Sequence, residues 1–80
     1  MKLSYEFLDE NGEENQVTFG IIQERNAIRP YGIRAEIFRN GKLAETAEAT
    51  ERFLSSAEAE QVMKLLCRFQ VTPCTLCDVI

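Results

Sequence analysis

The feature that most constrains this chain is a regular alternation of apolar and polar residues in its first two thirds. Apolar side chains occupy every second position in four short segments, and mostly polar or small residues fill the positions between them. Because successive side chains of a β-strand point to opposite faces, this period of two predicts half-buried strands. The alternating apolar residues are Leu3, Tyr5 and Phe7; Val17, Phe19 and Ile21; Tyr31, Ile33, Ala35 and Ile37; and Leu43, Ala47 and Ala49.

Two Asn-Gly pairs divide these segments into two hairpins, because Asn-Gly is the strongest short signal for a tight β-turn. In the second hairpin, a three-residue loop that ends at Gly41 places Ile37 opposite Leu43. The same loop places Ile33 opposite Ala47. A two-residue loop splits the apolar residues between the two faces, so the hydrophobic pattern favours the three-residue loop.

The first hairpin leads to the same kind of turn. A three-residue loop over residues 10–12 places Tyr5 opposite Val17, and it places Leu3 opposite Phe19. All four segments then share one apolar face, so we predict a four-stranded antiparallel meander.

Glu45 interrupts the apolar pattern of the last predicted strand. In a meander this strand lies at the edge of the sheet. An inward-pointing charge on an edge strand discourages pairing with another sheet, and we interpret Glu45 in this way.

A helical period replaces the alternation after residue 54. Ser55 followed by Glu58 has the pattern of a capping box, with Ser as the N-cap. The apolar residues that follow have helical spacing and predict one amphipathic helix that runs to about Phe69. These residues are Ala59, Val62, Met63 and Leu66.

The pair Thr72-Pro73 indicates a second helix start, because Thr can cap a helix and Pro suits its first position. A short C-terminal helix is therefore predicted, with Leu76, Val79 and Ile80 on its apolar face.

These elements predict a single small α+β domain over residues 1–80. Its sheet is a four-stranded antiparallel β-meander, with one long helix packed on one face and a short C-terminal helix. The chain has 80 residues, of which 45% are hydrophobic, and this composition supports one small core.

The residue types argue against several chemistries. The chain has no His and only three Cys, so hydrolytic catalysis lacks a histidine base and a four-ligand zinc site lacks ligands. We expect no enzyme activity, no catalytic residue, no cofactor and no bound metal. No apolar run approaches the roughly 20 residues of a membrane span, and the first residues lack the apolar run of a signal peptide. A cytoplasmic protein without a membrane partner is therefore expected.

The textual match to a chemical motif is the CxxC run from Cys74 to Cys77. In thioredoxin-like enzymes this motif lowers a thiol pKa at a helix start, but there it follows a strand of a βαβ unit. Here it follows a meander, so small semi-buried apolar residues are the favoured interpretation. Thiol-dependent redox activity of Cys74 and Cys77 remains an alternative function.

Charge is unevenly distributed along the chain. The formal net charge of −4 argues against a dedicated nucleic-acid module. However, the segment 25–42 is basic, and it includes part of the connection Gln23–Pro30, which we predict to be the longest loop. Weak nucleic-acid binding through this segment is a second alternative. Its basic residues are Arg25, Arg29, Arg34, Arg39 and Lys42, with Glu36 as its acidic residue.

Several pieces of the second half of the chain occur together in a familiar order. They are the run Tyr31-Gly32-Ile33, the turn Arg39–Lys42, the helix entry Leu54-Ser55-Ser56, and the closing Thr72-Pro73 with Leu76 and Asp78-Val79-Ile80. In order and spacing these pieces resemble a domain-of-unknown-function family of short proteins from Firmicutes, mainly Clostridia. The resemblance covers roughly residues 31–80. It implies a small bacterial cytoplasmic protein without an assigned activity, in which Cys74 and Cys77 stand where the family pattern does not require cysteine.

The predicted apolar face is wider than one helix can cover. Four strands about 4.8 Å apart form a sheet roughly 15–20 Å wide, whereas a helix is about 10–12 Å across. Exposed aromatic surface marks interfaces, and two-fold dimers are the commonest oligomers. We therefore interpret the chain as a non-enzymatic protein-interaction or homo-oligomeric module, which forms a homodimer or binds another protein. The candidate interaction surface consists of Tyr5, Phe7, Phe19 and Tyr31.

Overall fold

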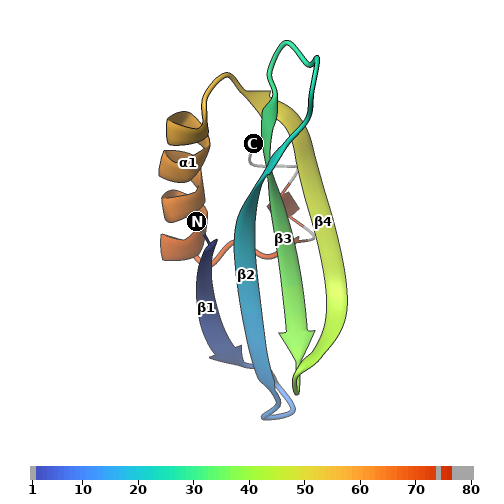
Figure 1. Cartoon of the computed structure of the whole chain (residues 1–80). Coiled ribbons are helices and arrows are strands. Elements are labelled where there is room, and N and C mark those ends of the chain that lie inside the picture. The colour runs from blue at the N-terminus through green and yellow to red at the C-terminus, as the bar shows by residue number, and fades with distance from the viewer. Residues whose placement is uncertain (1, 74, 77–80) are drawn as a thin grey trace.

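Four strands and one helix form the described part of the chain, which comprises residues 2–73, 75 and 76 of a computed structural model (Figure 1). The strands pair in the order β1-β2-β3-β4, and neighbouring strands are antiparallel, so the predicted meander and the α+β class are confirmed. The elements are β1 (Lys2–Leu8), β2 (Glu14–Gln23), β3 (Tyr31–Arg39), β4 (Lys42–Phe53) and α1 (Ser56–Arg68).

Helix α1 has the predicted start but an ordinary length. The Oγ of Ser55 accepts a hydrogen bond from the backbone N–H of Glu58 at 3.2 Å, which confirms Ser55 as the N-cap. The helix has 13 residues, close to the average for globular proteins, so it is not the long helix that we predicted. The predicted C-terminal helix is not confirmed, because residues 74 and 77–80 lie outside the described residues.

The first hairpin has the predicted register, in which Tyr5 pairs with Val17. Its three-residue loop is closed by the backbone N–H of Asp9, which donates to the carbonyl of Glu13 at 3.1 Å. Gly12 has a φ of 77°, the left-handed conformation that glycine adopts most easily.

The second hairpin corrects our predicted register. Its loop has two residues, Asn40 and Gly41, with φ values of 52° and 80°. Positive φ at both positions gives the type of turn that matches the right-handed strand twist. A β-bulge at Ala44 then realigns β4, so that Ile33 pairs with Ala49 rather than with Ala47. The bulge preserves the apolar face that the two-residue loop alone would have split.

A second irregularity occurs near the end of β4, where the register shifts between the pairs Ile33–Ala49 and Tyr31–Phe53. Gly32 lies at this shift. A Cβ atom on Gly32 would overlap the carbonyl oxygen of Ala49 and would lie 2.9 Å from the Cα of Thr50. The strands can approach this closely because residue 32 has no side chain.

The core lies between one face of the sheet and a layer formed by α1 and the chain that follows it. Buried residues come from β2, β3, β4 and α1, and Leu76 is completely buried as well. The described residues of the core are Val17, Phe19, Ile33, Ala35, Ile37, Ala49, Phe53, Ala59, Met63, Leu66 and Leu76. Val71 and Leu76 therefore add to the cover that α1 gives the sheet.

Glu45 lies where its pattern indicated. Glu45 is on the edge strand β4, where it pairs with Ile37 of β3, and its side chain is exposed. Its effect on association stays a prediction. The connection between β2 and β3 is the longest loop, as predicted, and the backbone N–H of Glu24 closes it by donating to the carbonyl of Pro30 at 2.7 Å.

A polar cluster closes the hairpin end of the core. The side-chain amide of Asn15, which is 2% exposed, donates to the carboxylate of Asp9 at 3.2 Å and to the carbonyl of Glu13 at 3.0 Å. Arg39 donates through Nε to the amide oxygen of Asn15 at 3.1 Å. The hydrogen bond from the backbone of Glu13 does most to lower the pKa of Asp9, against an opposing effect of desolvation.

We predict that Gly32→Ala destabilises the fold by about 2–4 kcal/mol, because the added methyl group displaces the backbone of β4. Gly20→Ala is the matched control, since a Cβ there meets only the side chain of Lys2 at 3.9 Å. The control should be neutral or slightly stabilising. Urea titration of both variants measures the difference, and equal stabilities would contradict the close approach at Gly32.

Asp9 should make stability depend on acid pH. Because its pKa is lower in the folded chain, the unfolded chain binds more protons, and the ionised carboxylate stabilises the fold above its ordinary pKa of about 3.8. This contribution is lost as the pH falls through the folded pKa. Asp9→Asn should therefore be less stable at neutral pH and should lose less stability on acidification.

The control for this prediction is Glu10→Gln, which changes the net charge equally in the same turn and is exposed. Thermal unfolding between about pH 2 and pH 6 measures the slopes. Parallel curves for the wild type and Asp9→Asn would show that the Asp9 network does not control acid stability.

Candidate functional site

An apolar groove runs beside α1 on the covered side of the sheet. Its volume is about 790 Å³, which is the size of a site for a peptide or a small molecule. Four structural pieces form its walls: α1, the end of β4, the β2–β3 loop and the chain after α1. The lining residues are Arg29, Arg52, Phe53, Val62, Leu65, Leu66, Phe69 and Val71.

Helix α1 carries two apolar stripes, and only one of them contributes to the core. Leu66 is 4% exposed, as expected for a residue that packs on the sheet. Its neighbour Leu65 is 51% exposed, and Phe69, one turn further along, is 70% exposed. Because residues four apart lie on one side of a helix, Leu65 and Phe69 form a second stripe, which faces the groove.

The rim of the groove is basic. Arg29 and Arg52 line it, and the guanidinium of Arg68 lies 5.8 Å from the centre of the Phe69 ring. Arg52 also donates to the carbonyl of Thr50 at 2.7 Å. Among the described residues, no acidic side chain lines the groove, although the whole chain has a net charge of −4.

The predicted interaction surface lies mostly inside the fold. Phe19 is completely buried, so it offers no surface to a partner, and our placement of Phe19 on an exposed patch was wrong. Tyr5, Phe7 and Tyr31 are half-buried and pack against the core. The hydroxyl of Tyr5 donates to the carbonyl of Val71 at 2.9 Å, and so ties β1 to the segment after α1. That Tyr5, Phe7 and Tyr31 contact a partner stays a prediction.

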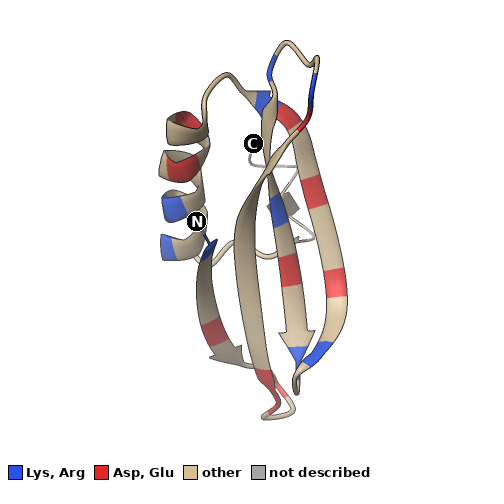
Figure 2. Cartoon of the chain, viewed as in Figure 1, with Lys and Arg blue, Asp and Glu red and all other residues tan. Residues whose placement is uncertain are grey.

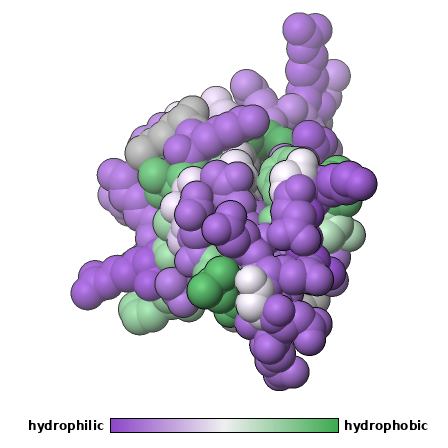
Figure 3. Space-filling view, turned by 90° about the horizontal axis from the view of Figure 1, so that it is seen from below, coloured by the Kyte–Doolittle hydropathy of each residue, from purple (hydrophilic) through white to green (hydrophobic). Residues whose placement is uncertain are grey.

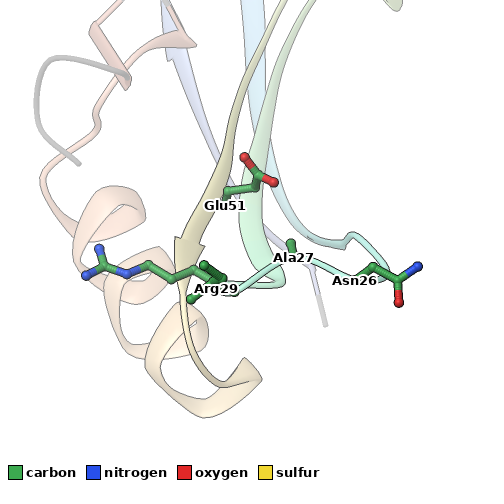
Figure 4. A pocket seen from close by; sticks show the side chains of 5 residues that line it. Asn26, Ala27, Arg29 and Glu51 are labelled. Carbon is green, nitrogen blue, oxygen red and sulfur yellow. The ribbon is translucent and has the colours of Figure 1, made fainter.

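A smaller hollow of about 480 Å³ lies between the β2–β3 loop and β4. Its polar side chains do not converge: Figure 4 shows Arg29 and Asn26 extending in opposite directions, with Glu51 pointing away from both. Binding sites bring a few polar groups together on one point, and this hollow does not. Arg29, which belongs to the β2–β3 loop, also lines the groove beside α1.

The basic residues of the segment 25–42 are dispersed in space. Figure 2 shows cations at both ends of the sheet and on its strands, with acidic residues between them. Arg34 pairs with Glu48 at 2.6 Å, and Arg39 lies within 4 Å of the carboxylates of Asp9 and Glu13. The basic side chains of this segment therefore form no single patch, and nearby carboxylates neutralise the charges of Arg34 and Arg39.

The end of the molecule that carries the two hairpin turns has a mostly hydrophilic surface (Figure 3). Seen from that end, hydrophilic side chains dominate and apolar ones appear in small areas between them (Figure 3).

The predicted redox pair is not part of the described structure. Cys74 and Cys77 lie outside the described residues. Cys67 is half-buried, and its Sγ lies 3.5 Å from the carbonyl oxygen of Ser4. Within the described part of the chain, no cluster of metal-ligating side chains occurs, and no helix is both long and apolar enough to cross a membrane.

Sequence reasoning missed the groove, although one signal was present. Leu65 and Phe69 follow Val62 at helical spacing, and they lie beside the stripe that we assigned to the core. A helix with two apolar stripes has more apolar surface than one sheet contact uses. No sequence signal indicated that Arg29 lines the groove, because only the fold brings this residue close to α1.

Comparison with known proteins gives a family but no activity. Neither a curated protein nor a solved structure matches the chain. Residues 1–80 match a family of unknown function, DUF6514. That match covers the whole sequence given, including both hairpins and α1. The chain therefore belongs to the DUF6514 family.

Proposed function

We propose that this protein is a non-enzymatic protein-binding module whose groove beside α1 holds a segment of a partner protein. The observation that carries the proposal is the exposure of Leu65 and Phe69 on the wall of an apolar groove. Large apolar side chains gathered on one surface mark interaction sites more often than isolated ones do.

The dimensions support a peptide-like ligand. Val62 of α1 and Phe69, the residue that caps the end of this helix, are seven residues apart, so the wall of the groove is about 10 Å long at 1.5 Å per residue. A helix of about two turns, or an extended segment of about three residues, spans this length. Amphipathic helices commonly bind in such grooves through apolar residues at helical spacing.

This proposal replaces the surface from which we predicted a partner, but it keeps the prediction of a protein interaction. The described core residues of the sheet pack against α1, Val71 and Leu76, whereas Leu65 and Phe69 stay exposed. We do not advance the redox or nucleic-acid alternatives, because Cys74 and Cys77 are undescribed and the basic side chains of the segment 25–42 are dispersed. The bacterial origin and the cytoplasmic location stay predictions.

The test uses photo-crosslinking from the full chain in the cells that naturally produce it. A photoreactive residue at position 65 faces the groove, and one at position 64, which is exposed and outside the groove lining, is the control. A discrete adduct is expected from position 65 alone. The cross-linked protein, once identified and purified, should bind the chain directly, and Phe69→Ser should weaken that binding. Equal adducts from both positions, or no direct binding, would refute the proposal.

We predict that Leu65→Gln separates binding from stability. Glutamine matches leucine in helix propensity, and position 65 is half exposed, so the unfolding free energy should change by less than about 0.5 kcal/mol. Binding to the partner should nevertheless fall. Leu66→Ala, at the neighbouring buried position, should cost about 2–4 kcal/mol. Equal destabilisation by the two substitutions would mean that Leu65 serves the core.

A further inference from the structure

We infer that the groove beside α1 selects an acidic amphipathic segment, with apolar side chains for its floor and carboxylates for its arginine rim. This inference rests on the proposed function and names the chemistry of the partner. Its basis is the contrast between an acidic protein and a groove whose charged lining residues, among those described, are Arg29 and Arg52.

The arginines at and near the groove come from separate elements of the fold. Arg29 belongs to the β2–β3 loop and Arg52 to the end of β4, close to the start of α1. Arg68 lies near the other end of α1, over the ring of Phe69. Because Arg52 already donates to Thr50 of its own chain, the carboxylates of a bound segment would meet Arg29 and Arg68.

Arg29 is the strongest of these candidates for contact with a partner. It forms no ion pair with any other described residue, whereas Arg34 and Arg39 both lie beside carboxylates of their own chain. A guanidinium beside apolar surface pairs with a carboxylate more strongly than one in open water does, because the surface displaces solvent.

A second copy of the chain fits this groove less well. In a two-fold interface the same patch meets itself, so the arginine rims of the two copies would approach each other. Like charges across an interface are unfavourable. A single-stranded nucleic acid would supply anions, but its successive bases stack on several exposed rings. Of the two aromatic residues that line the groove, Phe53 is buried and Phe69 alone is exposed.

The test measures binding of two labelled helical peptides of about 15 residues to the full chain by fluorescence anisotropy. Both peptides carry leucines at helical spacing; one has glutamates at the flanking positions and the other has lysines. The acidic peptide should bind about ten-fold more tightly, as expected for one or two charge pairs, and added salt should reduce the difference. Equal binding of the two peptides would overturn the inference.

Reversing the charge of single arginines tests which residue causes the preference for the acidic peptide. Arg29→Glu should abolish the preference for the acidic peptide and improve binding of the basic one. Arg25→Glu is the matched control, because it makes the same charge change in the same loop outside the groove lining, and it should keep the preference. An equal loss in both variants would show that only overall charge matters, and would overturn the inference.

Two further outcomes would also overturn it by identifying another occupant. One is a dimer in sedimentation that Phe69→Glu converts to a monomer, which would assign the groove to a second copy. The other is peptide binding that occurs only in a chain ending at Leu76, which would assign it to residues 77–80.

The two proposals fail differently. A partner cross-linked from position 65 that binds without charge preference leaves the proposed function intact and refutes only the acidic specificity. The absence of any partner refutes both.

Discussion

The groove side of this protein depends on the close contact between Gly32 and the backbone of β4. Because residue 32 has no side chain, β4 can bend over it, and Glu51 takes a φ of 55° in the irregular stretch. After the bend Phe53 returns to the core, and Arg52 faces the groove. One backbone approach therefore sets the end of the sheet, the start of α1 and one wall of the groove.

Helix α1 shows how one short element can serve both stability and binding. Its buried stripe, which includes Met63 and Leu66, holds the helix on the sheet, and its capping by Ser55 satisfies the first turn. The stripe that includes Leu65 and Phe69 contributes little burial to the described chain. Apolar surface left in water has no stabilising role, and the partner that we propose would cover this second stripe.

The charge distribution supports the same division. On the sheet and at the hairpin end, arginines lie beside carboxylates, as Arg34 does with Glu48 and Arg39 with Asp9. At the groove, Arg29 lies beside apolar residues and forms no ion pair with any other described residue. Membership of the DUF6514 family assigns no activity, so the proposed binding rests on this groove and its rim.

The sequence by itself determined which elements form. The alternation in the first two thirds of the chain, the Asn-Gly turns and the Ser55 cap each act over a few residues. Strands, turns and the start of the helix could therefore be predicted from local pattern. Only the tertiary structure decided the pairing of β3 with β4, because the bulge at Ala44 reconciles a local turn preference with packing across the whole sheet. The same holds for the groove. Arg29 and Phe69 are 40 positions apart, and nothing in their local sequence relates them, since only the bend of β4 over Gly32 and the packing of α1 bring them to one surface.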